Sequence, residues 1–214
     1  MTLNRIQAAL SELYDVEVDP RVEDFVCDAD IVRQTAGHGP EDRGEVLVVA
    51  EDEEGVSVGL YVCASAVAAV GEDVGAAWLD SGRFQGACLA TEGVSHFLYL
   101  AFREQNDQGV TQLELELQAE VDKYATALLS GNGVGAIRAR SRDLRRRLFG
   151  HVRFLDGRDS PEGERYRLAH RLAARYLGRL EESFLARADV GALLRELRRF
   201  YRLGLREKVE TASR

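Results

Sequence analysis

Glutamate and histidine side chains recur one helical turn apart at two places in this chain. Glu92 and His96 are four residues apart, and Glu116 and Glu120 repeat that spacing further along. Residues four apart lie on the same face of a helix, so each pair points in one direction. His170 could add a ligand from a third helix. Carboxylate and imidazole groups together bind divalent transition metals, so the five residues form a candidate metal site inside a helical bundle.

The spacing differs from the pattern of di-iron carboxylate bundles. Those bundles use Glu-x-x-His at i,i+3 twice, with two further glutamates. Here the Glu–His spacing is i,i+4 and it occurs once. An antiparallel pair of helices centred near Gln108 would place His96 level with Glu120. The alternatives to a metal site are a Glu–His ion pair, or separate side chains that point to solvent.

Arginines form two rows in which every fourth residue is basic, so each row follows one helix face. The rows are Arg138, Arg142 and Arg146, and then Arg167, Arg171, Arg175 and Arg179. Like charges at this spacing cost a few tenths of a kcal/mol each, so anions are expected nearby. The anions could be acidic residues of the same chain, the acidic surface of another protein, or a nucleic-acid backbone. The two rows are therefore the candidate partner-binding residues.

The charges of the chain are divided between its two parts. Residues 1–130 carry 25 acids and 7 bases, whereas residues 131–214 carry 11 acids and 21 bases. Surfaces of opposite charge on one molecule also favour self-association from head to tail. An isoelectric point of about 5.2 and the lack of a reader motif argue against nucleic acid. Of the 28 bases, only Lys123 and Lys208 are lysines, a ratio typical of GC-rich genomes, so the identity of the arginines alone is weak evidence of function.

Other chemistries lack their motifs. The glycines at 130–135 have no Lys-Ser/Thr after them, and no Gly-x-Ser-x-Gly occurs, so no phosphate loop, no hydrolase nucleophile and no cofactor are expected. No apolar run approaches the roughly 18 residues that a membrane span requires, so no membrane partner is expected. Three widely spaced cysteines, Cys27, Cys63 and Cys88, are expected to be buried thiols of a cytoplasmic protein.

The elements that must position these residues are mostly helices. Alternating apolar residues between Glu45 and Cys63 predict a β-hairpin. Helical periods predict a short N-terminal helix with Leu3, Ile6, Leu10 and Leu13 on one face, and helices over about 83–104, 111–129, 136–149, 160–187 and 189–204. The expected fold class is mostly α (α+β), a helical bundle of four to six helices with a small N-terminal β-hairpin. We expect one domain over 1–214, in which an acidic part, 1–80, packs on the bundle, 81–210.

Charge asymmetry without a catalytic motif favours a non-enzymatic, cytosolic protein-interaction module, such as an adaptor, regulator or assembly subunit. Its expected partner is an acidic protein surface or a second copy of the chain. The first alternative is a nucleic-acid-binding protein that uses the arginine-rich C-terminal helices. The second is a metal-binding helical-bundle enzyme that uses the Glu/His residues.

Overall fold

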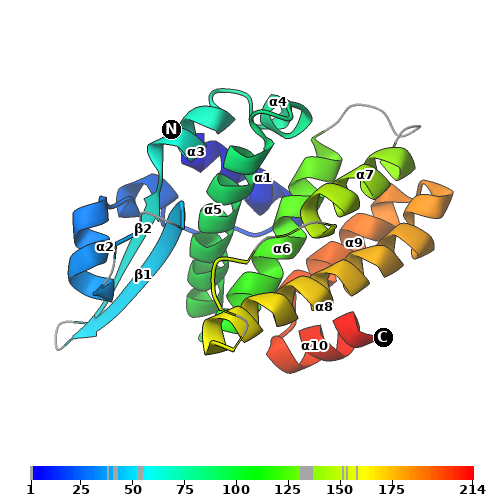
Figure 1. The fold of residues 1–214 in the computed structure, drawn as a ribbon. Helices are drawn as coiled ribbons and strands as arrows, with labels where there is room; N and C mark the ends of the chain where they lie inside the picture. Colours follow the sequence, from blue (N-terminus) through cyan, green and yellow to red (C-terminus); the bar gives the residue numbers. More distant parts are fainter. Residues whose placement is uncertain are drawn as a thin grey trace.

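The computed structural model describes residues 2–37, 39–40, 43–52, 55–130, 137–150, 152, 154–157 and 159–214. Within these ranges it contains ten α-helices and one two-stranded hairpin (Figure 1). The mostly helical class is confirmed, but the expected number of four to six helices is wrong. The helices are α1 (Thr2–Tyr14), α2 (Ala29–Ala36), α3 (Ala64–Val70), α4 (Val74–Leu79), α5 (Phe84–Gln105), α6 (Gln112–Leu129), α7 (Ile137–Phe149), α8 (Pro161–Ser183), α9 (Val190–Arg202) and α10 (Leu205–Ser213).

The helices that sequence reasoning missed are short. α3 and α4 form in a stretch of small residues, where alanine favours helix but the apolar period is too brief to recognise. Gly71 separates them with a positive φ of 62°, a conformation that glycine adopts readily. α10 begins directly after Gly204, the residue that was expected only to end α9. Short helices of this kind depend on tertiary packing more than on local sequence signals.

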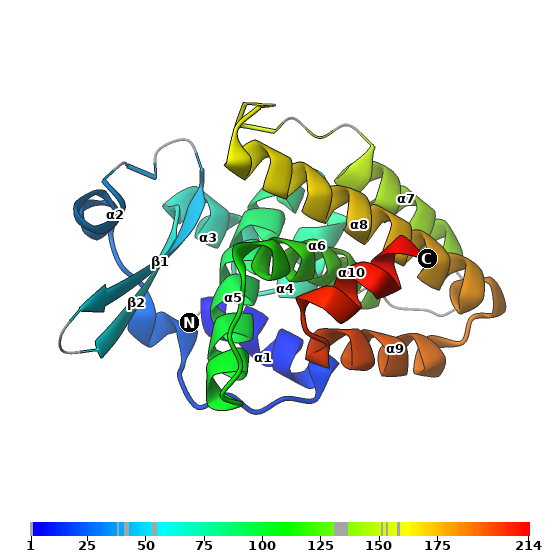
Figure 2. The same ribbon diagram turned by 90° about the horizontal axis from the view of Figure 1, so that it is seen from below.

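The central helix of the fold is α6, which packs against α5 on one side and α8 on the other (Figures 1 and 2). Its N-terminus is fixed by a capping box, in which the Thr111 hydroxyl accepts from the Glu114 N–H and the Glu114 carboxylate accepts from the Thr111 N–H. Helices on both sides bury polar side chains of α6 as well as apolar ones, among them Gln118, Asp122 and Lys123. Each buried polar group therefore needs a partner inside the protein.

The hairpin lies against the outer side of α5. It consists of β1 (Glu45–Asp52) and β2 (Gly55–Val62), paired antiparallel with Leu47 opposite Leu60. A Cβ at Gly93 of α5 would lie 3.2 Å from side-chain atoms of both Leu60 and Val62, so the glycine allows the hairpin to approach the helix closely. This approach brings Glu45, the first residue of β1, against α5.

One cluster of buried apolar side chains extends from Leu3 in α1 to Ala212 in α10. Within the described residues, no helix has the length and apolar character needed to cross a membrane. The three cysteines are free thiols; Cys88 is buried, but Cys27 and Cys63 are only half-buried, because the hairpin that flanks them is covered on one side. The 131–136 segment, which includes most of the glycine-rich loop, lies outside the described residues.

Candidate functional site

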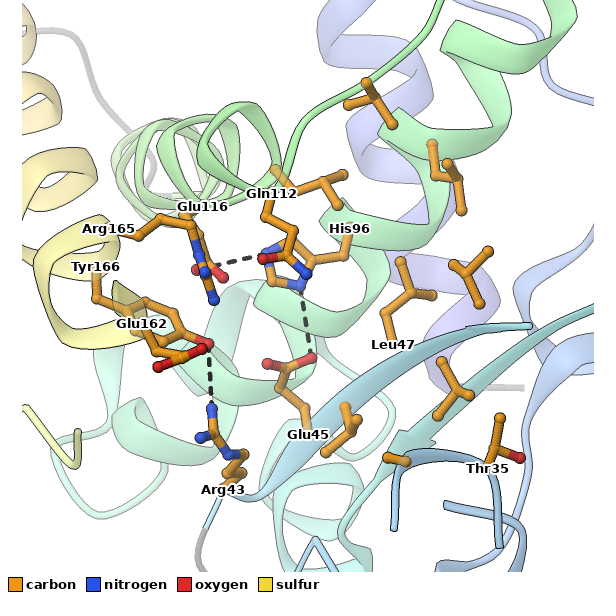
Figure 3. A pocket seen from close by; sticks show the side chains of 17 residues that line it. Thr35, Arg43, Glu45, Leu47, His96, Gln112, Glu116, Glu162, Arg165 and Tyr166 are labelled. Carbon is orange, nitrogen blue, oxygen red and sulfur yellow. Dashed lines mark hydrogen bonds and ion pairs between the residues drawn. The ribbon is translucent and has the colours of Figure 1, made fainter. Parts of the chain in front are cut away.

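His96 lies between two glutamates from different elements. Its Nδ1 is 3.6 Å from Glu45 Oε2 on β1, and its Nε2 is 3.8 Å from Glu116 Oε2 on α6 (Figure 3). Both separations exceed hydrogen-bond length. His96 Nε2 and Glu45 Oε2 are buried and have no hydrogen-bond partner among the described residues. Since buried polar atoms are normally paired, these two atoms are unusual and call for an explanation.

Lys123 connects two further acidic side chains, Glu92 and Glu120, and these residues with Glu45, His96, Glu116 and His170 are called the cluster below. Its ammonium donates to Glu92 Oε2 at 2.9 Å and to Glu120 Oε1 at 3.1 Å. Glu120 Oε1 is also 3.8 Å from His170 Nδ1, which has no hydrogen-bond partner among the described residues. The five predicted residues thus fall into two sets of contacts, His96 with Glu116 and, through Lys123, Glu92 with Glu120 and His170.

The pairing between α5 and α6 differs from the expected one at His96. Glu116, not Glu120, is the α6 residue that His96 contacts. Glu92 and Ser95 of α5 contact Lys123 and Asp122 of α6, within one residue of the pairing centred near Gln108. The two helices cross, as Figure 2 shows, so a pairing drawn for antiparallel axes does not hold along their whole length. Glu120 contacts His170 on α8 instead of His96.

The cluster contains more negative than positive charge. Four carboxylates, those of Glu45, Glu92, Glu116 and Glu120, face one ammonium and two imidazoles. Even with both imidazoles protonated, one negative charge has no partner within the cluster. The exposed fraction of each of these side chains is below 20%. Uncompensated charge is costly at such burial, so the cluster needs further cations or bound protons.

The pKa values reflect this excess of negative charge. Burial raises the pKa of Glu116 to about 7, against the opposing effect of His96. Burial likewise raises the pKa of Glu92, although Lys123 counteracts it. Burial alone would lower the pKa of His96, but Glu45, Glu116 and Glu92 raise it to about 9. The cluster therefore holds protons where it lacks another cation.

At Lys123 and Glu120 the ion pair dominates. Burial would raise the pKa of Glu120, but Lys123 and His170 together lower it. Burial would lower the pKa of Lys123, but Glu120 and Glu92 raise it well above its ordinary value. Both groups are therefore charged, and Lys123 is the permanent cation of the cluster.

Three residues of the cluster have the geometry of a metal site. Glu92, His96 and Glu116 each offer one ligand atom, and these atoms all lie within 4.8 Å of one another. Metal bonds of 2.0–2.2 Å hold neighbouring ligand atoms roughly 3–3.5 Å apart, so shifts of about an ångström would complete coordination. One imidazole with two carboxylates suits a divalent first-row transition metal. Glu120 and His170 lie on the far side of Lys123 and are not part of this group.

A cavity of about 570 Å³ opens beside His96 and Glu116 (Figure 3). Elements far apart in sequence form its walls: α2, β1, α5, α6 and the start of α8. Its lining residues are Thr35, Ala36, Arg43, Glu45, Val46, Leu47, Val48, Val49, His96, Leu100, Val110, Gln112, Leu115, Glu116, Glu162, Arg165 and Tyr166. Two of the three candidate metal ligands, His96 and Glu116, thus line a space that a small molecule could enter.

Neither arginine row pairs with the acidic residues 1–130 among the described residues. Arg142 lies 3.6 Å from Glu181, and Arg146 lies 2.5 Å from Asp143. Arg171 and Arg175 are exposed. Arg138 is also exposed. Arg167 donates to the carbonyls of Asp156 and Gly157, and the Arg179 guanidinium lies 5.7 Å from the Tyr176 ring centroid.

Arginines of α9 contact the acidic part of the chain through its backbone instead of its carboxylates. Arg198 donates to the carbonyl of Leu13 at 2.9 Å, and Arg202 donates to the carbonyl of Tyr14 at 3.0 Å. Cations at the carbonyl end of a helix satisfy otherwise unpaired acceptors and favour the helix dipole. These contacts therefore stabilise the C-terminus of α1.

A second buried polar network occupies another face of α6. The Asp122 carboxylate accepts from Tyr14 Oη at 2.5 Å and from Ser95 Oγ at 2.6 Å, and Gln118 donates to it at 2.7 Å. Lys208 donates to Gln118 Oε1, and its Nζ lies 4.6 Å from the Tyr99 ring centroid. Lys208 is fully buried, and burial lowers its pKa to about 7. Because the side chains of this network are all buried, we assign the network a structural role.

Two members of the candidate site escaped sequence reasoning. Glu45 was assigned to the hairpin, and only tertiary packing brings a strand residue to His96. Lys123 did carry a signal, because the chain has 26 arginines and only two lysines. Both lysines are buried, whereas most of the arginines are not. Lysine, which is rare in this chain, therefore occurs in each of the two buried polar networks.

Comparison of the chain with protein-family models, with curated proteins and with solved structures found no match.

Proposed function

We propose that this protein binds one divalent first-row transition metal ion through Glu92, His96 and Glu116. The observation that carries the proposal is the close approach of one ligand atom from each of Glu92, His96 and Glu116. In addition, His96 Nε2 is buried and has no hydrogen-bond partner among the described residues. A metal ion would take the lone pair of that nitrogen. It would also supply the positive charge that the cluster lacks.

The elements around the site would hold its ligands in place. Lys123 donates to Glu92 Oε2 and so orients that carboxylate. Glu45 lies beside His96 Nδ1 and would accept its proton, which leaves Nε2 as the metal ligand. A bound ion would act as a Lewis acid on a ligand in the adjoining cavity. The proposed class is therefore a metal-dependent bundle protein.

Equilibrium dialysis of the chelator-treated protein against Zn²⁺ or Mn²⁺, followed by elemental analysis, tests the proposal. We expect one ion per chain in the wild type. Glu116→Gln keeps the size of the side chain but removes a charged ligand, so we expect a loss of affinity of at least tenfold. A wild-type chain that retains no ion at micromolar metal would overturn the proposal.

Glu196→Gln is the matched control. Glu196 forms an ion pair with Arg199 at 2.8 Å on the surface of α9, so the substitution removes the same charge outside the cluster. We expect it to bind metal as the wild type does. Equal losses in both variants would mean that the effect is non-specific.

A second candidate function is contact with an acidic protein surface or with a second copy of the chain. Exposure of Arg171 and Arg175, without an ion pair among the described residues, favours it. Arginines without an internal anion can pair with carboxylates of a partner. We propose that this function resides on α7 and α8, in a cytoplasmic protein, and that it is independent of metal.

Sedimentation velocity at low and high salt tests this second function, with a pull-down for unrelated partners. We expect association that weakens as salt rises and that is lost in the double variant Arg171→Glu, Arg175→Glu. Monomeric behaviour at every salt concentration, together with no captured protein, would refute it. A mobility shift of duplex DNA at low salt would instead favour the nucleic-acid alternative.

A further inference from the structure

The cavity beside the proposed metal site has the size of a small-molecule pocket. Its volume of about 570 Å³ falls within the usual 300–1,000 Å³ of ligand pockets. His96 and Glu116 line it, so an ion held by them would be reachable from the cavity. A ligand in this space could occupy the coordination positions that the protein leaves open.

One side of the cavity is apolar. Leu47 of β1, Leu100 of α5 and Leu115 of α6 line it together with Val110, and all four are only half-buried. Leu47, Val110 and Leu115 pack on the core but are not fully covered by it. An apolar group of a ligand would remove their remaining surface from water, which is favourable.

Among the described residues that line the other side, one arginine, Arg165, is available to a ligand. Arg43 also lines the cavity, but it is engaged by Asp156 at 2.9 Å and by Tyr166 at 3.3 Å. Arg165 forms no ion pair among the described residues, and its Nε is buried without a hydrogen-bond partner. Its guanidinium lies 5.4 Å from the Tyr166 ring centroid, and Figure 3 shows it extending from α8 toward Glu116.

We propose that the cavity binds a small amphipathic carboxylate, with its head between the metal ion and Arg165 and its apolar chain against the leucines. This inference rests on the proposed metal site. A guanidinium pairs with carboxylate oxygens in a planar geometry, and the ion would bind the same head group. Without the ion, the head group would lose one of its two cationic contacts, so binding should depend on metal.

Isothermal titration of the Zn²⁺-loaded protein with octanoate, octylamine and octanol tests the charge of the head group. We expect octanoate to bind more tightly than either of the other two compounds, and to bind at least tenfold more weakly once Zn²⁺ is removed. Shortening the chain from octanoate to hexanoate should weaken binding by roughly fourfold per CH₂. Tighter binding of octylamine, or no dependence on chain length, would overturn the inference.

Arg165→Gln identifies the contact, with Arg195→Gln on the exposed face of α9 as its control. We expect the first variant to bind octanoate at least tenfold more weakly and to keep its Zn²⁺, and the second to resemble the wild type. Unchanged binding by Arg165→Gln would overturn the role of this residue. A protein that binds Zn²⁺ but not octanoate would refute only this inference, whereas a protein that binds no metal would refute the metal site as well.

Discussion

Replacement of Lys123 by methionine tests how the buried cluster is held together. Methionine keeps the length of the apolar stem but removes the ammonium, which lies 2.9 Å from Glu92 and 3.1 Å from Glu120. The exposed fraction of all three side chains is below 20%. Among the described residues of the metal-free variant, Glu92 would have no cation within ion-pair distance, and Glu120 would have only His170 at 3.8 Å.

Breaking a buried ion pair on one side costs about 3–5 kcal/mol, because the remaining charge stays buried without compensation. We therefore expect Lys123→Met to lower the free energy of unfolding by this amount. With a denaturant slope of about 2–3 kcal/mol per M, the urea midpoint should fall by about 1–2.5 M. Adding Glu120→Gln to the variant removes one uncompensated buried charge and should restore part of the lost free energy of unfolding.

Urea unfolding of the chelator-treated protein, followed by circular dichroism, measures the change. Arg206→Met is the matched control, because Arg206 is 2.9 Å from Glu210 but its side chain is 90% exposed. An exposed pair contributes about 0–1 kcal/mol, so this control should unfold close to the wild type. A loss below about 1 kcal/mol in Lys123→Met, equal to that of the control, would refute the buried network.

Three further predictions concern other parts of the fold. Lys208 has a pKa lowered to about 7 by burial, so it loses its proton in the folded state at a lower pH than in the unfolded state. Between pH 7 and 10, the free energy of unfolding of the wild type should therefore rise relative to that of Lys208→Met, by at most about 1.4 kcal/mol per pH unit. Urea unfolding at several pH values measures this difference, and a difference that stays constant with pH would contradict the prediction. Gly86→Ala should lower the melting temperature although alanine favours helix, because its Cβ would lie 2.3 Å from Ala69 Cβ; an unchanged or higher value would disprove the clash. Tyr14→Phe removes a donor from the buried Asp122 carboxylate and should cost about 1.5–3 kcal/mol in urea unfolding, and a neutral effect would show that the hydrogen bond does not contribute.

The long helices were predictable because their start signals are local. Thr111 and Glu114 form the capping box of α6, and α8 begins with Ser160 as the N-cap and Pro161 as the first helical residue. The hairpin was predictable from its alternation, which the observed pairing of Leu47 with Leu60 matches. These signals act over a few residues and need no knowledge of the rest of the chain.

The candidate site was only partly predictable, because its geometry depends on how helices cross. Spacing placed Glu92 and His96 on one face, but it gave the wrong α6 partner for His96. The contact with Glu45 depends on the close approach of the hairpin at Gly93, which is a tertiary effect. Local patterns therefore identify the side chains that can do chemistry, whereas packing decides which of them meet.

Anomalous diffraction from crystals of the Zn²⁺-loaded protein tests the central claim most directly. We predict one anomalous peak per chain, within about 2.0–2.2 Å of His96 Nε2 and of carboxylate oxygens of Glu92 and Glu116. The peak should be absent from crystals of Glu116→Gln prepared in the same way. No peak at these residues in the wild type, or peaks only on the surface, would contradict the account.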